Sequence, residues 1–181
     1  MKIAIALVLL AACGDDGGST TADGGTDSGG SSFTTCTGTC TTTGVTATFG
    51  ANTKTLDEAY YGITASTQTV YLEVLAGGNG TCPTTSSPSE DYTLVLSTVA
   101  VPTDITAQSP MSAAFDFKGD LLPNGAIHAF GTSATLTPTN ANMPAAATGF
   151  IAADVSVAFG GDGTMTGHLY AIHCASFDTT N

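Results

Sequence analysis

The chain has 181 residues and a formal net charge of −12, with a pI near 4.1. Only three residues are basic, Lys2, Lys54 and Lys118, against 15 acidic ones. Because arginine is absent and negative charge dominates, we expect the chain to repel nucleic acid and anionic lipid rather than bind them. Charged residues make up 10% of the chain, and threonine, serine, alanine and glycine are abundant, which favours an extracytoplasmic protein.

Residues 1–12 have the order of an export signal. Lys2 precedes an apolar run over residues 3–10, and two alanines lead to Cys13. Such a run, as a helix, reaches only about half way across a bilayer, which predicts a cleaved signal and not a membrane span. The sequence Leu-Ala-Ala-Cys at residues 10–13 resembles the lipobox of bacterial lipoproteins. The resemblance implies cleavage before Cys13 and a lipid on its thiol that holds the protein in a membrane. The alternative is an ordinary signal peptide with a chance cysteine.

Residues 13–32 are predicted to be the lipidated cysteine followed by a disordered acidic linker. After Cys13 this segment contains only glycine, serine, threonine, alanine and aspartate. It cannot bury enough apolar surface to offset the entropy of ordering the chain. Gly14, rather than an aspartate, follows Cys13. The resemblance to lipoproteins then favours the outer membrane of the cell envelope, on its periplasmic face or at the cell surface.

Residues 33–181 are predicted to form one all-β domain. Apolar and polar residues alternate in most of it with a period of two, and glycine and proline turns separate the runs. Eight short strands without a convincing amphipathic helix favour an antiparallel β-sandwich, with a small β-barrel as the alternative. The predicted strands are 45–49, 56–63, 70–74, 92–96, 113–117, 127–136, 155–159 and 165–174.

Four cysteines remain once Cys13 is assigned to lipid: Cys36, Cys40, Cys82 and Cys174. An even number of thiols in an oxidising compartment predicts two disulfides. Three pairings are possible, and we favour Cys36 with Cys40, closing a short loop, and Cys82 with Cys174, tying a mid-chain loop to the last predicted strand.

Three histidines are the candidate polar site residues, because histidine serves as a base or a metal ligand: His128, His168 and His173. The last two are five residues apart on one predicted strand and should face opposite sides of the sheet. A zinc site that combines Cys36 and Cys40 with His173 and Cys174, or with His168, is the alternative to disulfides. A hydrolase that uses His128 or His168 with a carboxylate is an alternative function, although no Gly-x-Ser-x-Gly motif is present.

Carboxylate pairs, polar turn residues and tyrosines are the other candidate binding groups. Neighbouring carboxylates should diverge along a strand and act as solvated charges, not as an acid–base pair. Oxygen-bearing side chains in turns are potential calcium ligands, so a calcium-stabilised, adhesion-like module is a further alternative, although no EF-hand or RTX repeat occurs. Four tyrosines could form an exposed carbohydrate- or protein-binding face. The carboxylate pairs are Asp57–Glu58 and Glu90–Asp91, the turn residues are Asn79, Asp120 and Asp162, and the tyrosines are Tyr60, Tyr61, Tyr71 and Tyr170.

Three stretches carry a wider resemblance: residues 77–83, the segments Ser87-Pro88 and Asp91-Tyr92-Thr93-Leu94, and residues 167–174. Together with the acidic Cys-Gly-Asp-Asp start at Cys13, they resemble uncharacterised lipoproteins of myxobacteria and related predatory bacteria. The resemblance implies an envelope address and no particular activity. We therefore expect a lipid-anchored, non-enzymatic structural or binding module without a cofactor, and with an envelope protein or a carbohydrate as its partner.

Overall fold

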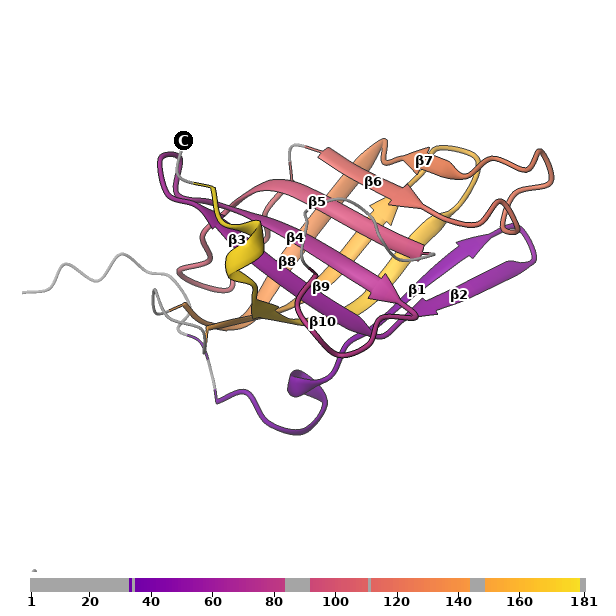
Figure 1. Cartoon of the computed structure of the whole chain (residues 1–181). Coiled ribbons are helices and arrows are strands. Elements are labelled where there is room, and N and C mark those ends of the chain that lie inside the picture. Colours follow the sequence, from indigo (N-terminus) through magenta and orange to yellow (C-terminus); the bar gives the residue numbers. More distant parts are fainter. Residues whose placement is uncertain (1–32, 34, 84–91, 111, 144–148, 180–181) are drawn as a thin grey trace, which may run out of the picture.

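A computed structural model describes residues 33, 35–83, 92–110, 112–143 and 149–179 (Figure 1). The predicted signal, Cys13 and the linker lie outside these ranges. Within them, neither of the two short helical turns has the length and apolarity of a transmembrane helix. The elements are η1 Gly38–Thr41, β1 Gly44–Phe49, β2 Asn52–Leu56, β3 Glu58–Thr64, β4 Thr69–Ala76, β5 Tyr92–Ala100, β6 Ser112–Asp116, β7 His128–Phe130, β8 Ser133–Asn142, β9 Phe150–Ala158, β10 Thr164–His173 and η2 Ala175–Phe177.

Two of the eight predicted strands are each a pair of strands. In the segment 56–63, β2 ends at Leu56, the chain leaves the strand conformation at Asp57, and β3 begins at Glu58. In the segment 127–136, Gly131 and Thr132 separate β7 from β8. The backbone N–H of Gly131 bonds to β6 and that of Thr132 to β9, so the chain crosses here between opposite sides of the fold. The other six predicted strands are confirmed.

The described strands form one continuous sheet that curls into an open half-barrel (Figure 1). One path through the sheet runs β2, β1, β10, β3, β4, β5, β6, β7, and β9 and β8 extend from the other side of β10. The all-β class is confirmed, and the arrangement lies between the predicted sandwich and the alternative barrel. One pairing departs from an antiparallel sheet, because β10 and β3 run parallel.

β10 is the strand at which the sheet forks. Its first half pairs with β1, as far as His168 opposite Gly44, and its end pairs with β3, where Ile172 lies opposite Tyr60. Between these partners, the Thr43 hydroxyl takes the place of a neighbouring strand at Tyr170. It accepts the Tyr170 N–H at 2.9 Å and donates to the Tyr170 carbonyl at 3.2 Å. A side chain therefore satisfies the backbone at the point where β10 changes partner.

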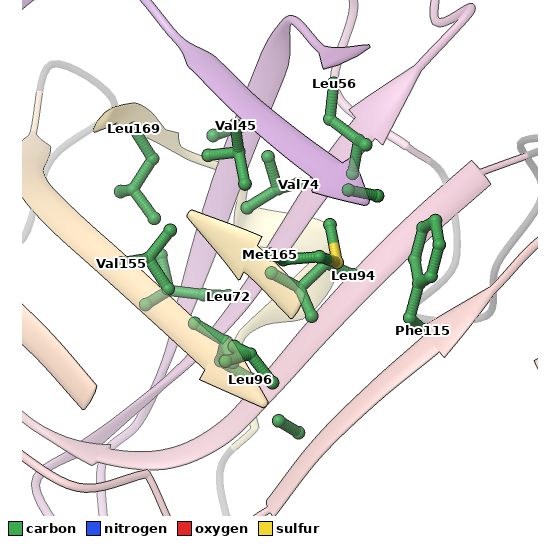
Figure 2. Close-up of a cluster of buried hydrophobic side chains, with 14 of the residues drawn as sticks. Val45, Leu56, Leu72, Val74, Leu94, Leu96, Phe115, Val155, Met165 and Leu169 are labelled. Carbon is green, nitrogen blue, oxygen red and sulfur yellow. The ribbon is translucent and has the colours of Figure 1, made fainter. Parts of the chain in front are cut away.

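The main core fills the concave side of the curled sheet. Side chains that alternate along β1, β4, β5, β9 and β10 meet there, as Figure 2 shows for Val45, Leu72, Leu96, Val155 and Leu169. Each of these five side chains is buried. The periodicity that predicted the strands is thus the periodicity of burial, and removal of this apolar surface from water drives the fold.

A second, smaller cluster lies on the other face of the sheet, under η2. It contains Tyr60, Leu75, Cys174 and Phe177, all buried. Gly62 in β3 is required beneath it, since a Cβ at this position would overlap Phe177. Because η2 covers the outer face of β3, this strand is buried on both faces.

The structure contains both favoured disulfides, Cys36–Cys40 and Cys82–Cys174. The first closes the loop that carries η1, and the second joins the segment after β4 to the end of β10. The zinc interpretation is wrong for this state of the protein, because all four thiols are consumed in S–S bonds.

Candidate functional site

The three histidines do not gather at one site. His128 lies on β7 with an exposed side chain, and its ring centroid is 5.5 Å from that of Phe130. His168 and His173 occupy different surroundings, as their spacing on β10 predicts. The ring of His173 packs at 5.3 Å on the core residue Tyr61, whereas His168 contacts the η1 loop on the convex side.

His173 fastens the C-terminal segment to the sheet. Its Nε2 lies 2.9 Å from Oδ1 of Asp178, and the same oxygen accepts the backbone N–H of Ile63 at 2.8 Å. The adjacent Tyr61 hydroxyl is buried and has no hydrogen-bond partner. Burial, and secondly the negative charge of Asp178, raise the pKa of Tyr61 to about 12. These groups stabilise the fold and do not present a free base to solvent.

His168 holds the η1 loop against the sheet. Its Nδ1 lies 2.8 Å from Oδ1 of Asp154, and its Nε2 lies 3.1 Å from the backbone carbonyl of Cys40. A carbonyl oxygen only accepts hydrogen bonds, so Nε2 carries the proton and donates it to Cys40. The lone pair that a general base needs is therefore not offered to a substrate at this nitrogen. Asp154 and His168 are residue types found in hydrolase sites, but the hydrogen bonds of His168 are those of a structural residue.

Two recesses flank the η1 loop beside β10. The first, which we call the fork recess, lies where β10 changes partner and has a volume of about 500 Å³. The second, the His168 recess, has a volume of about 380 Å³. The fork recess is lined by residues 41–43, Asp57, Glu58, Ala59, Tyr60, Gly80, Tyr170 and Ile172. The His168 recess is lined by Thr35, Thr39, Cys40, Thr139, Asp154 and His168.

Aromatic and aliphatic side chains form one wall of the fork recess. The ring of Tyr170 stacks on that of Phe150, with centroids 5.1 Å apart and an interplanar angle of 28°. Ile172, next on the same face of β10, is 41% exposed. The Tyr170 hydroxyl makes no hydrogen bond to any other described residue. The recess thus has a supported aromatic wall whose polar tip is available to a ligand.

Carboxylates form the opposite wall of the fork recess. Glu58 is held in place, because its oxygens accept the Tyr60 hydroxyl at 2.9 Å and the Gly80 N–H at 3.2 Å. Asp57 beside it is exposed. Asp57 lies between β2 and β3 and belongs to neither strand, so the expected divergence of neighbours along a strand does not apply to this pair, and both residues line the recess. The other predicted pair, Glu90–Asp91, lies outside the described residues.

No basic side chain is among the residues that line the fork recess. Lys54 lies elsewhere, with its Nζ 4.2 Å from the ring centroid of Tyr92. The two carboxylates repel anionic ligands, so the recess is suited to neutral or cationic ones.

Of the four tyrosines predicted to form an exposed face, Tyr60 and Tyr61 are buried. Tyr61 is fully buried in the core, whereas Tyr60 and Tyr170 line the fork recess. Tyr71 packs edge-on against Phe177 and donates to the buried carboxylate of Glu73 at 2.6 Å. Burial, followed by this hydrogen bond, raises the pKa of Tyr71.

The three turn residues considered as calcium ligands, Asn79, Asp120 and Asp162, lie in different parts of the fold. Asn79 accepts the Thr81 N–H at 3.0 Å, Asp120 accepts the Tyr92 hydroxyl, and Asp162 lies in the turn before β10. Among the described residues, no three histidine, cysteine or acidic side chains gather closely enough to hold a metal ion.

Comparison with known proteins places the chain in no family. No family model, curated protein or solved structure matches it. The chemistry of the two recesses is then what bears on function.

Asp154 is a site residue that the sequence-based reasoning did not select, although a signal was present. The Gly160–Gly163 turn joins β9 to β10, and residues equally far from a hairpin turn lie opposite each other. The connection between the paired residues runs from Phe159 to Gly163 and is centred on Gly161, and counting seven residues outward from Gly161 in each direction places Asp154 opposite His168, as the register confirms. The fork recess had no such local signal, since separate segments of the chain build it.

Proposed function

We propose that this chain is a lipid-anchored protein of the bacterial envelope whose domain binds carbohydrate without chemical turnover. The anchor is the predicted lipid on Cys13, and residues 14–32 would hold the domain away from the membrane surface. The carbohydrate ligand is supported by one observation, which is the composition of the fork recess.

Sugar rings present an apolar face and a rim of hydroxyl groups. An aromatic side chain supported from behind suits the apolar face, as Tyr170 is by Phe150. Carboxylates and threonine hydroxyls suit the rim, because they accept hydrogen bonds from it. Glu58 is already oriented by Tyr60 and Gly80, which lowers the entropy lost on binding. Anionic polysaccharides would be disfavoured by Asp57 and Glu58.

A hydrolase is less well supported by the same contacts. His168 has both ring nitrogens directed at protein acceptors, and His173 is directed at Asp178. Neither histidine lines the fork recess, which contains the aromatic and carboxylate groups suited to binding a ligand.

The binding proposal is tested with the full chain, purified in detergent, on immobilised glycans of three kinds: neutral, amino-bearing and anionic. Neutral or amino-bearing glycans should bind and anionic ones should not. Tyr170→Ala should weaken binding by about tenfold or more, the loss expected for one aromatic contact. Thr166→Ala is the matched control, since Thr166 lies exposed on the same strand outside both recesses. Absence of binding to every glycan, or equal binding by Tyr170→Ala, would overturn the proposal.

The envelope address is tested separately with Cys13→Ser in a bacterial host. The natural chain should fractionate with membranes and carry added acyl mass, and the variant should lose both properties. Membrane association of the variant without acyl mass would contradict the lipid anchor. Failure of this test leaves the binding test unaffected, because the two use different parts of the chain.

A further inference from the structure

The His168 recess contains polar groups that the fold does not use fully. Asp154 is fixed by His168 through Oδ1, yet its side chain is 65% exposed. The hydroxyl of Thr139 is buried and has no hydrogen-bond partner. Buried hydroxyls are nearly always hydrogen-bonded, so an unpaired one beside a recess is a candidate for a hydrogen bond to a ligand. The hydroxyls of Thr35 and Thr39 complete a polar lining.

Thr139 occupies this position because β8 is irregular there. Pro138 lies opposite Ala153 and Asn140 lies opposite Ala152, which leaves Thr139 as the extra residue of a β-bulge. Bulges redirect side chains and are enriched beside binding sites. The bulge lies on the strand pair β8–β9 that also carries Asp154, so two elements bring hydrogen-bonding groups to the same recess.

The two recesses share a face of the sheet. His168, Tyr170 and Ile172 alternate along β10 and therefore point to the same side. From His168 to Ile172 the strand extends about 13 Å, at the usual rise per residue. This length exceeds that of one sugar ring, and a chain of linked rings could contact both recesses.

The η1 loop lies between the recesses, and hydrogen bonds attach it to β10. Thr39 and Cys40 face one recess, and residues 41–43 face the other. None of the residues of η1 is buried. The bond from His168 to the Cys40 carbonyl and the bonds between Thr43 and Tyr170 attach it to β10. A segment with little buried apolar surface opens at low cost.

We propose that the two recesses are subsites of one groove that binds a chain of linked sugar units, with Asp154 and Thr139 as the hydrogen-bonding groups of the second subsite. The disulfide-closed η1 loop shifts when the longer ligand binds, and the hydroxyl of Thr139 then gains its missing partner. This inference rests on the proposed carbohydrate binding and adds that the ligand is an oligomer. Tyr170 supplies the apolar contact of the first subsite.

The test is a series of affinities for oligomers of increasing length, measured by calorimetry on the full chain in detergent. The probes are N-acetylglucosamine and its chitin-type oligomers, and glucose and its maltose-type oligomers. In the natural protein, affinity should rise roughly tenfold or more from the single sugar to the longer oligomers, because the second subsite adds contacts. Backbone N–H exchange at Cys40 and Thr42 should change only with the longer ligands.

Two variants separate the subsites. Asp154→Asn and Thr139→Val should reduce the affinity for longer oligomers to that for the single sugar, and should leave the single-sugar affinity unchanged. Tyr170→Ala should weaken binding of every probe. Ser156→Ala, exposed on the same strand as Asp154 and outside both recesses, is the control for Asp154→Asn.

The outcomes distinguish the two proposals. If single sugars and oligomers bind equally, or if Asp154→Asn weakens both alike, the second subsite is overturned and carbohydrate binding stands. If no probe of either series binds the natural protein, the groove is overturned together with carbohydrate binding at the fork recess.

Discussion

The two disulfides should contribute very differently to stability, because they close loops of different length. Cys82 and Cys174 are 92 residues apart in the sequence, and Cys36 and Cys40 are four apart. A disulfide stabilises mainly by restricting the unfolded chain, and this effect grows with the logarithm of the loop length. The perturbation is the replacement of each pair, in turn, by two alanines.

The long loop gives roughly 5 kcal/mol and the short one roughly 2 kcal/mol in the chain-entropy model. Cys174 is also completely buried against Tyr60, Leu75 and Phe177, so Cys174→Ala removes packing as well. We expect Cys82→Ala/Cys174→Ala to lower the free energy of unfolding by about 4–6 kcal/mol. A loss of this size is comparable to the whole stability of many domains, and it should lower the melting temperature by about 10–20 °C.

The assay is urea unfolding of the full chain, followed by circular dichroism, with Cys36→Ala/Cys40→Ala as the matched comparison. The midpoint and the slope are fitted together, because an opened loop exposes more surface when the chain unfolds. Equal losses of stability in the two double variants would refute the loop-length reasoning. A larger loss from the short loop would show that the Cys36–Cys40 loop has a structural role that its exposed position does not indicate.

Three further changes test the packing and the backbone. The pKa of Tyr61 is raised to about 12 from an ordinary value of 10.0, so the unfolded chain loses this proton first. Stability should be independent of this group below about pH 10 and fall by up to about 1.4 kcal/mol per pH unit between about pH 10 and 12. In Tyr61→Phe, alkaline unfolding should show a shallower fall, and stability at pH 7 should rise by roughly 1 kcal/mol, because the substitution removes a buried hydroxyl that has no partner; a steeper fall or a loss of stability at pH 7 would contradict this. Gly62→Ala should cost about 2 kcal/mol or more in urea unfolding, because its Cβ would overlap Phe177, whereas Gly161→Ala, in open space, should cost less than about 1 kcal/mol. Thr98 lies where the register between β4 and β5 shifts, and its φ of +56° is unfavourable for a β-branched residue. Thr98→Gly should therefore raise the melting temperature by relieving about 1 kcal/mol of strain, and a lower melting temperature would contradict this.

The strands could be predicted because their signal is local. In β1 every second side chain is buried, and in β10 the buried side chains all fall at alternate positions, and hydrophobic alternation records this directly. Asp57 and Gly131 interrupt two predicted strands, and the alternation changes phase at both places. Leu56 and Ala59 lie in the same core three residues apart, and Ala129 and Leu136 lie in it seven residues apart. The fork of β10 leaves no local signal, because its two partners, β1 and β3, are set by packing between segments far apart in the sequence.

In the candidate site, too, only the features with a local signal in the sequence could be predicted. The cysteine count predicted the disulfides, and the spacing of His168 and His173 predicted that they would not share a site. The expected divergence of Asp57 and Glu58 depends on strand geometry, and Asp57 lies between two strands. Their partner Tyr170 is more than 100 residues away in the sequence, so only the folded chain brings these groups together.

The position of β10 in the sheet has a consequence for how the chain is made. It is the only described strand that joins β9, β1 and β3, and it follows every other described strand in the sequence. Until residues 164–173 have been synthesised, the hairpin β1–β2 and the strands from β3 to β7 have no common neighbour. Pairings between segments so distant in sequence form slowly and leave strand edges open in the meantime. The strong negative charge of the chain, distributed over its length, would keep these unfinished chains apart until the sheet can close.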